Sequence, residues 1–160
     1  MGDHRRFDLF AKKIKASFGT GHVVADVAGG KGYLNLALKE NGFTKVVTYD
    51  PKSRTRIGKD NHKGACFNEN RGFTLLVGMH PDEATDVIID EATKAHIPFA
   101  VCPCCIMPNR FTFWENHTFT NWVKHLRSIA IKRGYEIQDL YLPMTGKNLV
   151  LVGKPRRNYS

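Results

Sequence analysis

The chain has 160 residues, of which 42% are hydrophobic, and a formal net charge of +9 at neutral pH. From this length we expect one compact domain over residues 1–160, without a separate substrate domain. No run of about 18 apolar residues is present to span a membrane. The N-terminus lacks the apolar stretch of a signal peptide, so we expect a soluble, cytoplasmic protein without a membrane partner.

Basic residues outnumber acidic residues by 24 to 15 and are spread along the whole chain. This balance favours RNA or another polyanion as the partner. The alternative is a solvated basic surface that only keeps the protein soluble. Three of the four cysteines lie within residues 102–105. Because such clustering is not a distributed disulfide framework, we expect a reducing compartment.

The first predicted element is a leading amphipathic helix within residues 1–20, because apolar residues recur at helical spacing over about 4–17. An apolar run that begins at Val23 then ends in a glycine-rich turn, and a helix is expected over 33–39. Glycines let a ligand approach the main chain, and a helix N-terminus offers unpaired N–H groups. This strand, turn and helix therefore indicate a site for a nucleotide-type cofactor.

The details of the glycine-rich turn narrow the choice of cofactor. A dinucleotide fingerprint would have a third glycine where Asn35 stands, and a phosphate-binding P-loop would need serine or threonine after a Gly-Lys pair. The remaining signals are two acids. Asp26 precedes the glycines, and Asp50 closes the second apolar run, over 46–50, where an acid is well placed to bind both ribose hydroxyls.

The chain resembles the Rossmann-like (class I) S-adenosylmethionine-dependent methyltransferases, and the residues that match their motifs are Asp26, Gly30, Gly32 and Asp50. Their first motif has the form D-x-x-x-G-x-G, and their second strand ends in a ribose-binding acid. The resemblance implies that the glycine-rich turn holds the methionine part of S-adenosylmethionine. The expected cofactor-binding residues are Asp26, Ala28, Gly29, Gly30, Gly32, Tyr33, Asp50 and His80. The alternative is a Rossmann-like domain with a different ligand or none.

The remaining segments are predicted to alternate between helices and strands. They are a short helix over 52–61, strands over 64–67 and 73–78, a helix over 82–95, a strand over 98–102, a helix over 118–133, and two strands over 135–142 and 148–153 joined as a hairpin. The expected fold is α/β: a three-layer Rossmann-like methyltransferase sandwich with a mostly parallel seven-stranded sheet and a C-terminal antiparallel hairpin.

Two loops follow the carboxyl ends of the fourth and fifth predicted strands, where open α/β sheets gather their reacting groups. Their sequences, Gly78-Met79-His80 and Pro103-Cys104-Cys105, resemble a subgroup of methyltransferases with G-L-H and P-C-C elements, some of them linked to RNA modification. Met79 departs from that pattern. His80 is the candidate general base, and Asp82 would orient it or bind the acceptor. The alternative is that His80 and Asp82 cap the following helix.

The cysteine cluster permits several interpretations. Cys104 is a candidate nucleophile toward a pyrimidine ring, and Cys105 a candidate substrate contact. A redox pair is a further option, and a turn that only shapes the acceptor pocket is the structural alternative. Zinc is not expected, because Cys102 and Cys105 supply two ligands and only Cys66 or His117 would complete a set of four.

An aromatic loop over 111–114 is the candidate acceptor contact. Arg110 and Trp114 are expected to bind substrate, with Phe111 and Phe113 either in a stacking platform for a base or in the core. The resulting hypothesis is a methyltransferase that uses S-adenosylmethionine and acts on RNA or another nucleic acid. A small-molecule or protein methyltransferase, or a catalytically silent nucleic-acid-binding module, are the alternatives. A homodimer or a partner protein would supply further recognition surface.

Overall fold

The computed structural model of the chain describes residues 5–52 and 61–157. Its elements in chain order are α1 (Arg6–Phe18), β1 (Val23–Val27), α2 (Tyr33–Glu40), β2 (Lys45–Tyr49), β3 (His62–Lys63), β4 (Leu75–Met79), the 3-10 helix η2 (Asp82–Ala84), α3 (Thr85–Ala95), β5 (Phe99–Cys102), α4 (Phe119–Lys132), β6 (Tyr135–Tyr141) and β7 (Leu149–Pro155). The helix predicted over 52–61 lies, except for its two end residues, outside the described residues.

The strands form one seven-stranded sheet in the order β3-β2-β1-β4-β5-β7-β6. The first five strands are parallel, and β7 runs antiparallel to both of its neighbours. This arrangement confirms the predicted fold. The direction of strand order reverses between β1 and β4, and at this switch the loops that follow neighbouring strands diverge and leave room for a ligand.

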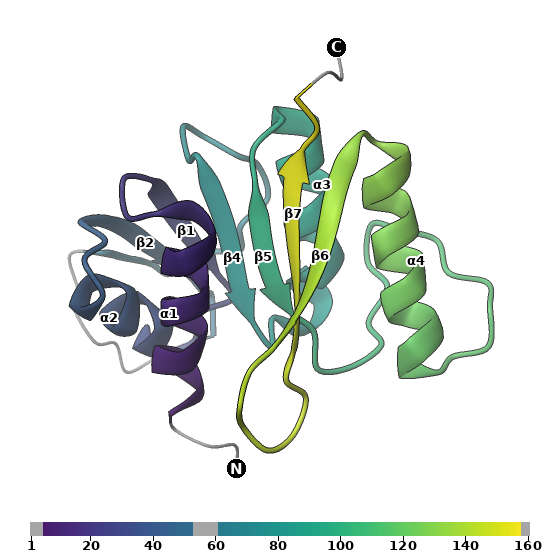
Figure 1. The fold of residues 1–160 in the computed structure, drawn as a ribbon, viewed down its shortest axis with the longest axis horizontal. Coiled ribbons are helices and arrows are strands. Elements are labelled where there is room, and N and C mark those ends of the chain that lie inside the picture. Colours follow the sequence, from purple (N-terminus) through teal and green to yellow (C-terminus); the bar gives the residue numbers. More distant parts are fainter. Residues whose placement is uncertain (1–4, 53–60, 158–160) are drawn as a thin grey trace.

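Helices cover both faces of the sheet, as Figure 1 shows with α1 and α2 in front and α3 behind. Successive strand residues point to opposite faces, so that Val24 packs with α1 and α2 whereas Ala25 packs with α3 and α4. Two apolar cores result, one on each side of the sheet. No helix in the described part of the chain combines the length and the hydropathy that crossing a bilayer requires.

The local sequence signals explain most helix ends. The leading helix buries Phe10, Ala11 and Ile14, one stripe of its amphipathic pattern. The helix α2 ends where predicted, at Asn41 and Gly42, and Gly42 has the positive φ of 101° that glycine adopts without strain. The side chain of Thr118 accepts a hydrogen bond from the backbone N–H of Asn121 and so caps the N-terminus of α4.

The third strand is the clearest wrong prediction in the sheet. Residues 64–67 were expected to form it, but β3 is His62–Lys63, which pairs with Thr48 and Tyr49. The apolar signal of the predicted segment comes from Phe67, which is buried and packs edge-on against the Tyr49 ring at 5.1 Å. Its hydrophobicity therefore serves core packing after the chain has left the sheet, and a two-residue edge strand has no hydrophobic pattern to detect.

Candidate functional site

A pocket of about 220 Å³ lies at the carboxyl ends of β1, β2 and β4, beside the reversal in strand order. Four of the residues predicted for the site line it together: Ala28, Asp50, His80 and Asp82. They come from three separate loops, and parallel strand pairing brings them to one edge of the sheet. The structure thus brings the start of the glycine-rich loop, the end of β2 and the loop after β4 to one cavity.

The glycine-rich loop is shaped by close packing against the strands below it. A Cβ atom at Gly29 would overlap Oδ2 of Asp26 and Cγ2 of Thr48, so this position requires glycine. Ala28, Gly30 and Gly32 all have positive φ, between 56° and 95°. Such a conformation turns the chain sharply between β1 and α2, and it is the reason why glycines recur in this segment.

Asp50 ties the loop to the end of β2. Its Oδ2 accepts a hydrogen bond of 2.9 Å from the backbone N–H of Gly30, and its Oδ1 accepts one of 2.8 Å from the N–H of Lys52. On the other side, Nε2 of His62 lies 2.8 Å from the carbonyl oxygen of Gly30. These contacts hold the loop beside a carboxylate that also lines the pocket, as a ribose-binding acid must do.

Asp26 supports the loop from below. It is fully buried, and its Oδ2 accepts a hydrogen bond of 2.8 Å from the Thr48 hydroxyl, which in turn accepts one from the Asn35 amide. Its Oδ1 has no hydrogen-bond partner among the described residues. Burial raises the pKa of Asp26 to about 7, because the charged form is poorly solvated. Sequence reasoning placed this acid at the site without showing that it lies beneath the loop.

His80 lies in the pocket with one ring nitrogen engaged. Its Nε2 is 2.9 Å from the carbonyl oxygen of Lys147, in the loop between β6 and β7. Because a carbonyl only accepts, this bond assigns the proton to Nε2 and leaves Nδ1 as the acceptor in the neutral ring. His80 has a positive φ of 49°, a conformation that costs energy for a residue with a side chain.

The alternative that His80 and Asp82 cap the next helix is wrong. Neither η2 nor α3 has a side-chain cap in the structure. Asp82 instead directs its carboxylate toward two cysteines: its Oδ1 accepts hydrogen bonds from Cys104 Sγ at 3.1 Å and Cys105 Sγ at 3.5 Å. The loop after β4 and the loop after β5 are thereby joined.

The three clustered cysteines have two different environments. Cys102 is fully buried in β5, and its thiol donates to the Lys147 carbonyl. Cys104 and Cys105 are partly exposed, with their sulfur atoms 3.4 Å apart. Burial raises the pKa of both thiols, and the Asp82 carboxylate raises them further. As free thiols both are protonated at neutral pH and therefore weak nucleophiles.

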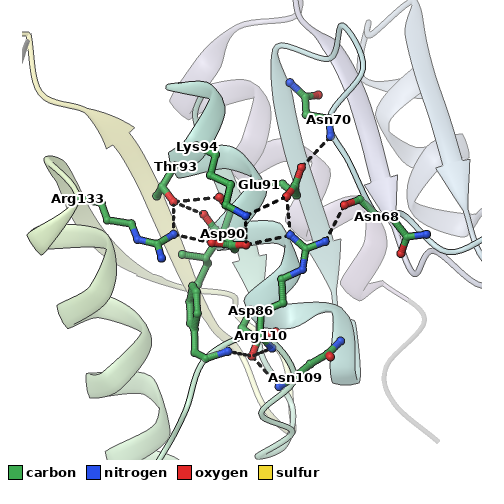
Figure 2. A network of polar contacts seen from close by, with 12 residues as sticks. Asn68, Asn70, Asp86, Asp90, Glu91, Thr93, Lys94, Asn109, Arg110 and Arg133 are labelled. Carbon is green, nitrogen blue, oxygen red and sulfur yellow. Dashed lines mark hydrogen bonds and ion pairs between the residues drawn. The ribbon is translucent and has the colours of Figure 1, made fainter.

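The residues predicted to contact substrate are separated. Arg110 is held by two acids of α3, Asp90 and Glu91, which we call the α3 acids (Figure 2). Its guanidinium also donates to the Asn68 carbonyl at 2.6 Å. Trp114, in contrast, is 90% exposed. Arg110 therefore has its donors engaged in the structure of the domain, whereas Trp114 is free of the core.

The surroundings of the α3 acids explain why Arg110 lies there. Burial alone would raise the pKa of Asp90, but hydrogen bonds from Arg133, Lys94 and Arg110 lower it to about 2. Asp86, one turn earlier on α3, accepts three backbone N–H groups of the loop over 109–111. The network in Figure 2 thus fastens the aromatic loop to α3. The spacing of acids along an otherwise apolar helix was the signal for it in the sequence.

The two phenylalanines of the aromatic loop belong to the core, as one of the two hypotheses predicted. Phe111 and Phe113 are each 7% exposed and pack in the core beneath α3 and α4. The ring of Phe113 lies 5.3 Å from that of Trp122. A stacking platform of three aromatic residues is therefore excluded, and Trp114 is left as its one exposed member.

No protein-family model and no curated protein matches the sequence. Solved structures do resemble it. One is CalO1, a methyltransferase of calicheamicin biosynthesis with bound SAH, with a TM-score of 0.61 and 16% identity over 96% of this chain and 54% of that one. Another is ribosomal protein L11 methylase from Lactobacillus delbrueckii subsp. bulgaricus, with a TM-score of 0.63 and 12% identity over 97% of this chain and 81% of that one. A third is PH1948 from Pyrococcus horikoshii, provisionally assigned as an RNA methyltransferase, with a TM-score of 0.58 and 12% identity over 94% of this chain and 81% of that one. The chain spans about half the length of CalO1.

These similarities show that the chain has the Rossmann-like fold of class I S-adenosylmethionine-dependent methyltransferases. The SAH in CalO1 is consistent with S-adenosylmethionine as the cofactor of this chain. The acceptors named for these structures range from a natural product to a protein and RNA, so the shared fold leaves the acceptor open.

Proposed function

We propose that this chain transfers a methyl group from S-adenosylmethionine to RNA. The observation that carries the proposal is one pocket wall that contains Ala28, at the start of the glycine-rich loop, together with Asp50 and His80. Asp50 would hold the ribose hydroxyls, and the loop that packs on Asp26 would hold the methionine part. Methyl transfer from a sulfonium mainly requires donor and acceptor in line, which a rigid wall of this kind provides.

His80 is the proposed general base. In the tautomer assigned above, Nδ1 is the nitrogen that can accept a proton from the acceptor as the methyl group arrives. The bond from Nε2 to the Lys147 carbonyl fixes the ring orientation and would stabilise the imidazolium that forms. A base of this type suits an acceptor with a dissociable proton, such as a hydroxyl or a ring N–H group.

RNA as the acceptor is supported by charge at the pocket end of the sheet. Exposed lysines occur in the loops at this end: Lys31 in the glycine-rich loop, Lys52 after β2, Lys63 at the end of β3 and Lys147 between β6 and β7. Lys52 also approaches Glu83, at 3.8 Å. Asp50, Asp82 and Glu83 line the pocket itself, so the lysines lie on loops around a pocket lining that contains three acids, in a chain whose net charge is +9. Phosphate groups of RNA would bind to such a rim.

The test is transfer of a labelled methyl group from S-adenosylmethionine to total cellular RNA at low salt. We expect label in RNA with the wild-type chain and none with Asp50→Ala. The matched control is Glu136→Ala, which removes an exposed acid on β6, at the opposite edge of the sheet. Both variants gain the same charge, so a difference between them reflects the pocket and not RNA attraction.

Three further outcomes separate the alternatives. Transfer that is lost in His80→Ala while S-adenosylmethionine still binds supports the role of the base. RNA binding without transfer by the wild-type chain would favour the catalytically silent module. Cofactor binding with neither labelled RNA nor salt-dependent RNA affinity would refute RNA as the acceptor and move the proposal to a small molecule or a protein.

A further inference from the structure

A second cluster of reactive groups adjoins the pocket and is not explained by cofactor binding. It consists of Asp82, at the start of η2, and Cys104 and Cys105, in the loop after β5. One ligand atom from each, a carboxylate oxygen and two sulfur atoms, can be chosen so that all lie within 4.8 Å of one another. We call these three residues the thiol-carboxylate cluster. Soft thiolates beside one carboxylate oxygen form a donor set that zinc accepts.

The separations within this cluster suit one small tetrahedral ion. With Zn–S bonds of about 2.3 Å and Zn–O bonds of about 2.1 Å, neighbouring ligand atoms of a tetrahedral zinc site lie roughly 3.5 to 3.8 Å apart. In the structure, the two sulfur atoms are 3.4 Å apart, and they lie 3.1 Å and 3.5 Å from Oδ1 of Asp82. Shifts of a few tenths of an ångström would therefore bring all three atoms to bonding distance.

The cluster differs from the pair of ligands that the spacing in the sequence suggests. A C-x-x-C pattern indicates Cys102 and Cys105, but Cys102 lies in β5 and packs in the core with α1 and α2. The adjacent residues Cys104 and Cys105 turn instead toward Asp82, 22 residues away along the chain from Cys104. The expectation of no zinc started from Cys102 and Cys105 and considered only Cys66 or His117 as further ligands, whereas the third ligand atom of this cluster comes from Asp82 in the loop after β4.

We propose that the thiol-carboxylate cluster binds one Zn²⁺ ion through Cys104 Sγ, Cys105 Sγ and a carboxylate oxygen of Asp82. Each thiol loses one proton when the ion binds, so two protons are released for each Zn²⁺. Three protein ligands leave the fourth position for water or for a donor atom of the acceptor, as in zinc sites that take part in chemistry. Asp82 also lines the pocket, which places the ion at its rim.

The proposal is independent of methyl transfer and is tested by metal binding itself. The purified full chain is freed of metal with a chelator and titrated with Co²⁺, whose thiolate-to-metal absorption reports bound sulfur directly. Zn²⁺ is then added to displace Co²⁺. We expect one ion per chain, quenching of the absorption by one equivalent of Zn²⁺, and two protons released in a weakly buffered titration.

Variants identify the ligands. Cys104→Ser and Cys105→Ser should each weaken Co²⁺ binding at least tenfold and reduce the absorption per ion, and Asp82→Asn should weaken binding while the thiolate absorption persists. The control, His96→Asn, removes an exposed potential metal ligand at the C-terminal end of α3, which does not line the pocket, and should leave the affinity unchanged. Circular dichroism and urea unfolding of each metal-free variant show whether the fold is retained.

The proposal is overturned if the wild-type chain binds less than one Co²⁺ ion or gives no thiolate absorption. It is also overturned if His96→Asn weakens binding as much as Cys104→Ser does. Either result would leave the methyltransferase proposal standing, because the assay does not involve transfer. If the wild-type chain binds the metal as expected but transfers no methyl group, the methyltransferase proposal fails and the zinc proposal stands.

Discussion

The buried carboxyl of Asp26 should make the stability of the chain fall with rising pH. In the folded chain this group is fully buried, and burial raises its pKa from 3.8 to about 7. The folded state therefore holds a proton that the unfolded chain has already lost between pH 4 and 7. Because the folded state binds more protons in this range, the free energy of unfolding decreases as the pH rises.

The magnitude follows from the two pKa values. Each pKa unit between the unfolded and the folded state corresponds to about 1.4 kcal/mol, so a pKa that rises from 3.8 to about 7 on folding corresponds to about 4 kcal/mol of stability. Asp26→Asn keeps the shape and the acceptor for the Thr48 hydroxyl but cannot ionise. The free energy of unfolding of the wild-type chain relative to this variant should fall by about 1.4 kcal/mol per pH unit from pH 4 to 7 and level off above pH 7.

The assay is urea unfolding of both proteins at unit steps of pH from 4 to 8, without cofactor. Asp8→Asn is the control without a pH trend: hydrogen bonds from Lys12 and Asn41 lower the pKa of this exposed carboxyl, so its contribution is present above its unfolded pKa of 3.8, throughout the range of the assay, and is lost only at lower pH. If the difference between wild type and Asp26→Asn is the same at pH 5 and pH 8, the carboxyl does not carry a raised pKa and the argument from burial fails.

Three other substitutions test the loop, the network and the core. Gly29→Ala should lower the affinity for S-adenosylmethionine at least tenfold, because the added Cβ would overlap Asp26. Gly21→Ala, at a position with open space around it, should leave the affinity unchanged. Equal affinities of the two variants in calorimetry would refute the packing argument. Arg110→Met should cost about 2 kcal/mol in urea unfolding, because it leaves the α3 acids short of a partner; unchanged stability with lost transfer would instead make Arg110 a substrate contact. Tyr135→Phe should cost about 1 to 2 kcal/mol, since the Tyr135 hydroxyl is the donor beside the carbonyl groups of Ala92 and Ile97, and no change in the unfolding midpoint would contradict this.

The sequence was sufficient to predict the fold and the glycine-rich turn because both depend on local patterns. Apolar runs with period two or continuous burial located β1, β2, β4 and β5, and glycines located the turn that Gly29 makes over Asp26. The weak strand β3 was misplaced because it has only two residues at the edge of the sheet, and its neighbour Phe67 carries the stronger apolar signal.

The parts that could not be predicted depend on contacts between distant segments. The guanidinium of Arg110 pairs with acids 19 and 20 residues away, and Asp82 meets Cys104 across 22 residues. Nothing in the local sequence distinguishes an arginine that binds a substrate from one that neutralises a buried acid. Likewise, the spacing of Cys102 and Cys105 suggested a pair that the fold divides between the core and the pocket rim.

The most direct test of the account is calorimetric titration of the metal-free chain with S-adenosylmethionine, comparing wild type with Asp50→Ala and Glu136→Ala. We predict one site per chain and an affinity that falls about tenfold to a hundredfold in Asp50→Ala, the equivalent of losing hydrogen bonds to a charged group. Glu136→Ala should bind as the wild type does. Absence of binding by the wild type, or equal affinity in Asp50→Ala, would contradict the assignment of this pocket to the cofactor.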